Sequence, residues 1–269
     1  MSLLDWSCRR YQRLFAVSHP EAEHLAALHS EREDDRFLQA YFDHEYRKGI
    51  RTLDRFRALG TEWLQGGRGL DFGCGAGGLT YRLREVCDEA VGIDLEEHKL
   101  AFARRQAQRL NADNVSFVCY DGTRVPLPDN HFRIILCVDV LEHVPDPAFV
   151  LREMHRLLQP GGWLLLAFGP PWYHAHGKHM WVKLPGWWTH LLFPRSTVMK
   201  LAGFPPQTTW PELGIQQLSV SRFQHACRAS GLVAFCEHLH SKAAFAPLRV
   251  VPGIRELFIS EVIGLYRKV

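Results

Sequence analysis

Residues 70–80 read Leu70-Asp71-Phe72-Gly73-Cys74-Gly75-Ala76-Gly77-Gly78-Leu79-Thr80, a short apolar strand that runs into a glycine-rich turn. Glycines at alternate positions let the backbone bend tightly and let an extended ligand approach the main chain. The helix after the turn has free amide groups at its N-terminus. An ordinary strand-to-helix turn can have the same pattern, so the choice between the two interpretations depends on the residues further along the chain.

Three further strands are predicted, and each ends at an acidic residue. Residues 90–94 end at Asp94, residues 115–120 precede Asp121, and residues 132–138 precede Asp139. In a doubly wound sheet the carboxyl ends of parallel strands share one edge, so Asp94 would face the same crevice as the glycine turn. There its carboxylate can accept hydrogen bonds from two ribose hydroxyls. The pattern therefore predicts an α/β fold with a nucleotide-like ligand at that edge.

The order of these features resembles the core of a family, the class I (seven-stranded, Rossmann-like) S-adenosylmethionine-dependent methyltransferases. Nicotinamide-binding folds spread their glycines as G-x-G-x-x-G, whereas here the glycines alternate and Asp71 precedes them. A nicotinamide-dependent oxidoreductase is further disfavoured because the chain has no Tyr-x-x-x-Lys pair. The resemblance covers residues 66–168, in five segments that keep the family's order: 69–77, 92–94, 120–129, 137–144 and 158–166.

This resemblance implies a doubly wound, mostly parallel seven-stranded sheet with helices on both faces and an antiparallel last strand. Residues 1–65 are expected to form an N-terminal helical cap and residues 66–269 the methyltransferase domain, with a substrate-lid insertion after the fifth strand at 169–215. Helices are predicted at 22–29, 33–59, 79–86, 96–110, 148–158 and 220–230, and the later strands at 163–168, 232–238 and 257–266.

The resemblance also implies a cofactor, S-adenosyl-L-methionine, and a product, S-adenosyl-L-homocysteine. The glycines would approach the methionine and ribose portions, Asp94 would hold the ribose, and Leu95 would lie against the adenine. Asp121 would accept from the adenine amino group, although a plain turn at Asp121-Gly122 is the alternative. Tyr46 and Arg47 are further candidates for cofactor contacts, with a surface charge as the alternative for Arg47. The predicted cofactor-binding residues are Asp71, Gly73, Gly75, Gly77, Asp94, Leu95, Asp121, Gly122 and Val138.

Methyl transfer is an in-line displacement at an activated carbon, so the protein must align the acceptor and, for a hydroxyl, remove its proton. Imidazole suits that task near neutral pH. The candidate bases are His143, after the fourth strand, and His176 and His179 in the insertion. A structural or helix-capping role is the alternative for His143.

The insertion holds five of the eight tryptophans, and the acceptor is expected to bind there. The predicted substrate-binding residues are Trp172, Tyr173, His174 and Trp181. The alternative is that these aromatic residues pack into a small core of the lid itself. A metal site on the nearby histidines is not predicted, because no Asp, Glu or Cys lies between residues 169 and 211.

The predicted function is O-methylation of a small-molecule or saccharide-type acceptor with a histidine base. One alternative is a lipid-linked acceptor at a membrane surface, because residues 180–195 combine tryptophans with Lys183 and Arg195. The other is a degenerate, non-catalytic interaction module with this fold.

Composition agrees with a cytoplasmic enzyme. The chain has 269 residues, of which 46% are hydrophobic and 23% charged, and its net charge is only +3, so no nucleic-acid partner is expected. Seven cysteines without a C-x-x-C pair fit a reducing compartment. No apolar run approaches the roughly 20 residues that span a bilayer, so peripheral membrane contact is the most that is predicted. The oligomeric state stays open.

Overall fold

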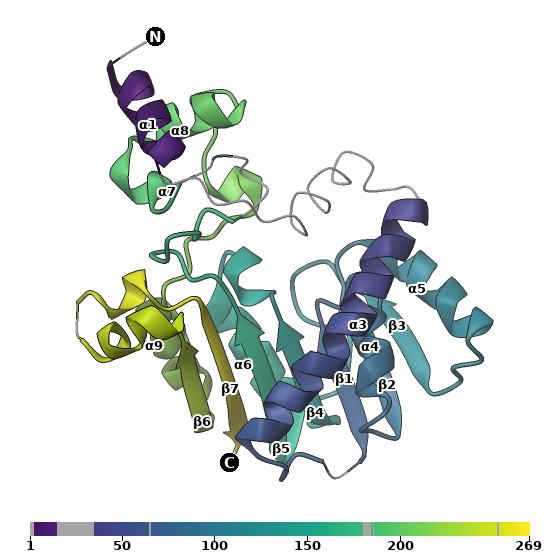
Figure 1. Ribbon diagram of the computed structural model, residues 1–269. Helices are drawn as coiled ribbons and strands as arrows, with labels where there is room; N and C mark the ends of the chain where they lie inside the picture. The colour runs from purple at the N-terminus through teal and green to yellow at the C-terminus, as the bar shows by residue number, and fades with distance from the viewer. Residues whose placement is uncertain (1–2, 15–34, 65, 180–183, 185, 252) are drawn as a thin grey trace.

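The computed structural model describes residues 3–14, 35–64, 66–179, 184, 186–251 and 253–269, and its centre is a seven-stranded sheet (Figure 1). The strand order is β3-β2-β1-β4-β5-β7-β6. Five strands run parallel, whereas β7 pairs antiparallel with both β5 and β6. The predicted sheet and its antiparallel last strand are confirmed. The strands are β1 (Arg68–Phe72), β2 (Glu89–Asp94), β3 (Val115–Cys119), β4 (Phe132–Val138), β5 (Leu158–Phe168), β6 (Leu232–His240) and β7 (Glu261–Lys268).

Helices cover both faces of this sheet, because its strands alternate apolar side chains between two buried cores. In β4, Ile134 and Leu136 pack with one set of helices, and Ile135 and Cys137 pack with the other. The first set is α3 (Asp35–Leu59), α4 (Gly78–Leu83) and α5 (Glu97–Arg109). The second set is α6 (Pro147–Leu157) and α9 (Val220–Ser230).

Two strands begin four or five residues away from their predicted starts, whereas the other strand boundaries differ by at most two residues. Strand β5 begins at Leu158 rather than at residue 163, because Leu158 pairs with Phe132 across a register shift in the ladder between β4 and β5. The glycines after Pro160 thus lie within the strand, with Gly161 in the left-handed region at φ 73°. Strand β7 begins at Glu261 rather than at residue 257, because Arg255–Leu257 forms a short 3-10 helix.

The insertion after β5 builds a third core of its own. Its helices are α7 (Thr189–Leu192) and α8 (Arg195–Ala202), and its hydrophobic core consists of Trp172, Leu184, Val198, Met199, Trp210 and Ile215. The indoles of Trp172 and Trp210 meet with their centroids 5.2 Å apart. The insertion therefore has a separate core, and it stands beyond the carboxyl ends of the parallel strands (Figure 1).

The two described helices that precede the sheet lie in different places. Helix α1 (Leu3–Leu14) lies beside α7 and α8 in the insertion, whereas α3 runs across the sheet (Figure 1). Lys200 of α8 pairs with the buried Asp5 of α1 at 2.7 Å, and the Tyr11 hydroxyl donates to the carbonyl of Trp187. The predicted helix at 22–29 lies outside the described residues.

Close contact between α3 and α4 depends on a glycine at the start of α4. A Cβ on Gly78 would stand 2.5 Å from the carbonyl oxygen of Phe42 and 2.7 Å from the amide nitrogen of Tyr46. These are backbone atoms of α3, which cannot swing aside as a side chain can. The helix that precedes β1 is thus held directly against the first helix after it.

Gly78→Ala should lower the free energy of unfolding by about 1–3 kcal/mol, because the added methyl group forces the two helices apart. Urea denaturation measures this change. Gly60→Ala is the matched control, since its added Cβ would meet first the carboxylate tip of Glu62, which can move. Equal losses in the two variants would contradict this account of the helix contact.

Candidate functional site

The glycine-rich turn is fastened to the end of the neighbouring strand. The amides of Gly73 and Cys74 both donate to the carbonyl of Ile93, at 2.8 and 2.9 Å. The amide of Gly75 donates to Oδ2 of Asp94 at 2.8 Å. Gly73, Gly75 and Gly77 all have positive φ, a region that side chains rarely adopt. The turn therefore has one defined shape, set by β2.

Two side chains approach this turn so closely that any Cβ would collide with them. A Cβ on Gly73 would lie 2.5 Å from Cγ2 of Val140, and one on Gly75 would lie 2.7 Å from Cε1 of Tyr41. Tyr41 belongs to α3 and was not identified from the sequence. The helical spacing of Tyr41, Glu45 and Lys48 on one face of α3 was the signal that could have found it.

Asp71 lies beneath the turn rather than on its surface. The side chain is 2% exposed, and its Oδ2 accepts a hydrogen bond of 2.7 Å from the hydroxyl of Thr80 in α4. Burial raises the pKa of the Asp71 carboxyl to about 7, although the Thr80 hydrogen bond acts in the opposite direction. Asp71 thus links the end of β1 to the helix after the turn.

The residues predicted to hold the ribose and the adenine come together at the ends of β2 and β3. Oδ1 of Asp94 accepts from the amide of Glu96 at 3.0 Å, so both carboxylate oxygens are oriented by backbone donors. Leu95 is 55% exposed, and a Cβ on Gly122 would lie 3.7 Å from its Cδ2. Asp121 accepts from the amide and hydroxyl of Thr123, which lowers the pKa of the Asp121 carboxyl. A solvent-exposed apolar surface therefore lies beside two carboxylates.

A paired charge lies directly after β4. Asp139 has φ 54°, and its Oδ2 forms an ion pair of 2.5 Å with Nζ of Lys48. Oε1 of Glu45 lies 3.5 Å from the same nitrogen. Burial lowers the pKa of Lys48, but the charges of Asp139 and Glu45 outweigh it and raise the pKa overall. The sequence placed Val138 and Asp139 at this edge but did not identify Lys48.

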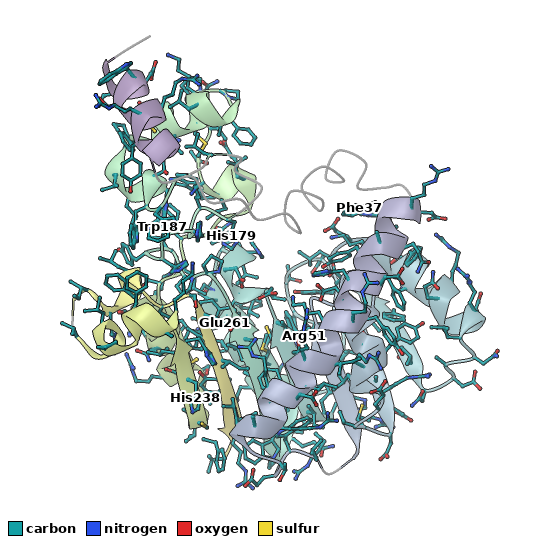
Figure 2. All side chains as sticks on the ribbon, in the orientation of Figure 1. Phe37, Arg51, His179, Trp187, His238 and Glu261 are labelled. Carbon is teal, nitrogen blue, oxygen red and sulfur yellow. The ribbon has the colours of Figure 1, made fainter. Side chains whose placement is uncertain are left out.

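Beside Asp139 there is an open pocket of about 260 Å³ that reaches the start of β7. Its walls are Asp139, Gly169, Pro170, Ser260 and Glu261. Arg55 of α3 forms a bidentate ion pair with the carboxylate of Glu261. Figure 2 shows His179 and Trp187 in the insertion, on the side of the sheet where Glu261 begins β7. The pocket therefore joins the end of β4 to the base of the insertion.

A buried carboxyl group lies behind this edge. Glu142 is 2% exposed, and burial together with the charge of Asp139 raises its pKa well above the ordinary range of a carboxyl. Its Oε1 accepts from the amide of Gly169 at 3.2 Å, and its Oε2 has no hydrogen-bond partner within the described part of the chain. Glu142 thus ties the turn after β4 to the exit of β5.

Two of the three candidate bases, His143 and His179, have their rings in contact. The rings of His143 and His179 lie 5.1 Å apart, and Nδ1 of His143 is 2.8 Å from the carbonyl of Gly214. Burial lowers the pKa of His143, and burial with the neighbouring His143 and His190 lowers that of His179 to about 3. His176 lies elsewhere, 5.6 Å from the ring of His174.

The predicted substrate residues are spread over different surroundings. Trp172 is 9% exposed and packs into the core of the insertion, where His190 and Trp210 border its ring. Tyr173 is 43% exposed, and His174 lines a second cavity. Trp181 lies outside the described residues. For Trp172 the surroundings are those of a small lid core.

Neither a metal cluster nor a membrane span is found in the residues that the structure covers. No group of three or more His, Cys, Asp and Glu side chains in the described ranges could hold an ion. No helix among them is both long enough and apolar enough to cross a bilayer.

Comparisons with known proteins agree with this geometry. Residues 70–166 match the family model described as a methyltransferase domain. A ubiquinone biosynthesis O-methyltransferase of Albidiferax ferrireducens is 30% identical over 170 residues, which are 58% of this chain and 65% of that protein. One from Pseudomonas aeruginosa is 37% identical over 105 residues, which are 39% of this chain and 45% of that protein. The chain thus matches less than two thirds of the length of either relative.

Solved structures share the fold. An S-adenosylmethionine-dependent methyltransferase from Aquifex aeolicus superposes with a TM-score of 0.55 at 15% identity, over 88% of this chain and 99% of that one. The [4+2]-cyclase SpnF superposes with a TM-score of 0.54 at 19% identity, over 83% of this chain and 80% of that one. At these identities the likeness concerns the fold.

The buried Asp71 should make stability fall as the pH rises. Its pKa is higher in the folded chain, about 7, than the value of about 3.9 expected when unfolded, so folding favours the protonated form. The stabilising effect is complete below about pH 4 and is lost as the pH rises to about 7. In Asp71→Asn this pH dependence should disappear, so stability relative to wild type should increase by about 2–4 kcal/mol over that window. Urea unfolding of both proteins at several pH values measures this, and parallel curves would contradict it.

Proposed function

Because the chain carries a class I S-adenosylmethionine-dependent methyltransferase domain, we propose that it transfers the methyl group of this cofactor to an oxygen atom of a small-molecule or saccharide-type acceptor. The observation that carries the proposal is the glycine turn held against the end of β2 with Asp94 beside it. A non-catalytic module would have no need for this combination of positive φ angles and an oriented carboxylate.

The residues at this edge fit the cofactor. Gly73 and Gly75 have positive φ and let Val140 and Tyr41 close over the turn, so these two side chains would border a ligand that passes along the main chain. Asp94 can accept hydrogen bonds from vicinal hydroxyls, since each carboxylate oxygen retains acceptor capacity beyond its single backbone donor. Leu95 exposes an apolar side chain of the kind that a flat purine covers. The set therefore suits a nucleoside with an extended tail.

Each group has a simple task in this scheme. The cofactor supplies a methyl group on a sulfonium sulfur, which is already activated for in-line displacement. Asp94 holds the ribose, Leu95 and Gly122 border the adenine, and Asp121 accepts from its amino group. Asp71 acts from below, because its hydrogen bond to Thr80 keeps the turn and α4 together. Residues 169–215 serve as a lid that keeps water from the acceptor.

His143 is our candidate for the base that deprotonates the acceptor hydroxyl. Its Nδ1 lies 2.8 Å from the carbonyl of Gly214, an acceptor, so Nδ1 carries the proton and Nε2 keeps its lone pair. The Gly214 carbonyl thus plays the part of the third group that orients the base in a general-base arrangement. His179 is a poor base at neutral pH because burial lowers its pKa to about 3. His176 is the remaining alternative.

Oxygen is the preferred acceptor atom for two reasons. The relatives from Albidiferax ferrireducens and Pseudomonas aeruginosa are both O-methyltransferases by name. A hydroxyl, unlike a neutral amine, must lose its proton as it is methylated, and His143 offers a lone pair for that purpose. The chemistry of the site and the names of the relatives therefore favour the same acceptor atom.

Asp94→Ala should weaken binding of S-adenosylhomocysteine by about 10- to 100-fold, because the hydrogen bonds to the ribose hydroxyls would be lost. Isothermal calorimetry gives the dissociation constant. The matched control is Asp88→Ala, which removes a carboxylate at the opposite end of the same strand pair, where it accepts from Gly67. If Asp94→Ala binds as tightly as that control, the ribose site has been misplaced. If the wild-type protein binds no S-adenosylhomocysteine, the non-catalytic alternative is favoured.

His143→Ala should reduce kcat for methylation of catechol by about 10²- to 10⁴-fold, because a general base is removed. The dissociation constant for S-adenosylhomocysteine should stay unchanged, which separates loss of a base from loss of the fold. Transfer of a labelled methyl group measures the rate. His176→Ala is tested in parallel, and a loss confined to that variant would assign the base to His176 instead.

A further inference from the structure

Lys48 of α3 lies where the glycine turn and the pocket beside Asp139 adjoin. Val140 closes over the turn, since a Cβ on Gly73 would stand 2.5 Å from its Cγ2. The residue before it, Asp139, lines the pocket. A methyl group that passes from a ligand on the turn to an acceptor in the pocket would therefore cross this boundary next to Asp139. Nζ of Lys48 is at the same boundary, 2.5 Å from Oδ2 of Asp139.

Several carboxylates lie close to this ammonium group. Oε1 of Glu45 is 3.5 Å from Nζ of Lys48, so the lysine faces Glu45 and Asp139 at once. A third carboxylate, that of Asp94, borders the turn, where it accepts a hydrogen bond from the amide of Gly75. Lys48 therefore keeps the boundary between turn and pocket from carrying a larger negative charge.

The position of Lys48 is set by a packed helix. A Cβ on the next residue, Gly49, would lie 2.6 Å from Cγ of Arg82 in α4, so the two helices are in close contact there. The side chain of Lys48 is 27% exposed, and a partly shielded ion pair keeps more of its Coulomb energy than one in open solvent. The two α3 residues considered from the sequence have other surroundings: the guanidinium of Arg82 lies 3.6 Å from the ring centroid of Tyr46, and Arg47 is exposed.

Methyl transfer removes a positive charge from the ligand, because the sulfur is a cationic sulfonium before the reaction and a neutral thioether after it. A free carboxylate at the boundary would therefore attract the cofactor more strongly than the product. It would also stabilise the charged ground state more than a transition state in which that charge is being lost, and this would slow the reaction. A carboxylate that is paired with a lysine has a weaker effect of both kinds.

We propose that Lys48 sets the preference of this site between cofactor and product. By pairing with Asp139, it weakens binding of the positively charged S-adenosylmethionine relative to binding of the neutral S-adenosylhomocysteine. Lys48 is a positioning residue in this role, since it acts through Asp139. The inference rests on the proposed function, because it takes the ligand of the glycine turn to be this cofactor.

The test measures binding of S-adenosylmethionine and of S-adenosylhomocysteine to the full chain by calorimetry, without an acceptor. In Lys48→Met the ratio of the dissociation constants, product over cofactor, should rise about three- to tenfold above the wild-type ratio, because the charge of Asp139 is then uncompensated. Lys48→Arg keeps the positive charge, so its ratio should stay near that of wild type. The increase in Lys48→Met should shrink between about 0.05 and 0.5 M salt, since salt screens partly exposed charges.

Lys268→Met is the matched control, because it removes the same charge from the other end of β7. Glu261 begins this eight-residue strand and lines the pocket, whereas Lys268 ends it, about 23 Å away. The ratio in Lys268→Met should equal that of wild type. A double-mutant cycle then tests the pairing itself: in an Asp139→Asn background, replacing Lys48 by Met should change the ratio less than it does in wild type.

Two results would overturn the inference. One is an unchanged ratio in Lys48→Met while both ligands still bind, and in that case the proposed function stands. The other is an equal weakening of both ligands, which would mean that Lys48 binds a group that cofactor and product share. If the wild-type protein binds neither ligand, the proposed function fails, and the inference fails with its premise.

Discussion

Three backbone amides of the glycine turn are held by the end of β2, and the rest of the site depends on this attachment. Gly73 and Cys74 donate to one carbonyl, and Gly75 donates to the carboxylate of Asp94. The same carboxylate is the candidate ligand for ribose, so one group both shapes the turn and faces the crevice. Tyr41 closes over the turn from α3, which can approach only because residue 75 has no side chain. A change at Asp94 would therefore affect binding and local backbone shape together.

Much of the sheet and of the cofactor edge could be predicted because both arise from local patterns. A parallel strand buried on both faces is a short apolar run, and β1, β2 and β4 each end at or next to an acidic residue. Helix α9 was predicted with its boundaries, since Ser219 caps its start and Gly231 ends it in the left-handed conformation. The start of β5 was missed because Pro160 and two glycines look like a turn in sequence, whereas pairing with β4 draws them into the strand.

The contacts that complete the site could not be predicted because they join segments distant in the chain. Lys48 reaches Asp139 across 91 positions, and Lys242 reaches Trp187 across 55. Helix α1 was grouped with α3 as one cap, but Asp5 meets Lys200 in the insertion. Neither Lys48 nor Lys242 is part of a sequence motif, so only the three-dimensional arrangement reveals them. The same limit applies to Trp172. Its sequence context fits a ligand-binding residue as well as it fits the buried core residue that the structure shows.

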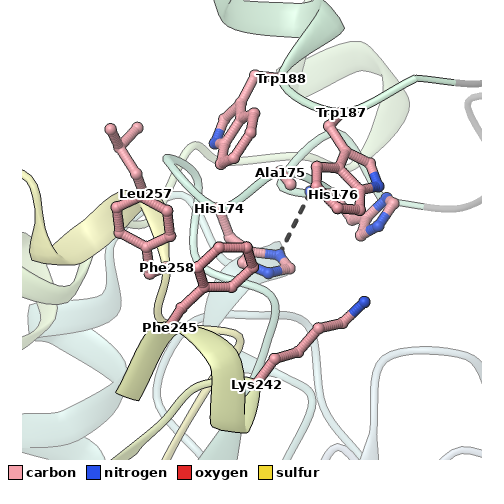
Figure 3. A pocket seen from close by; sticks show the side chains of 9 residues that line it. All are labelled: His174, Ala175, His176, Trp187, Trp188, Lys242, Phe245, Leu257 and Phe258. Atoms are coloured by element: carbon pink, nitrogen blue, oxygen red, sulfur yellow. Dashed lines mark hydrogen bonds between the residues drawn. The ribbon is translucent and has the colours of Figure 1, made fainter. Parts of the chain in front are cut away.

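The fold alone leaves the reaction open. A cyclase and a methyltransferase superpose on this chain with nearly the same TM-score, so the sheet and its helices suit more than one chemistry. What distinguishes such proteins must lie in residues outside the common core. Here those residues are the insertion and the β6–β7 connection, whose aromatic side chains pack together beside Lys242 (Figure 3). At the edge near Asp139 the described charges are already paired, Lys48 with Asp139 and Arg55 with Glu261. Because these charges already have partners, neither ion pair offers an unpartnered charge to a ligand at this edge.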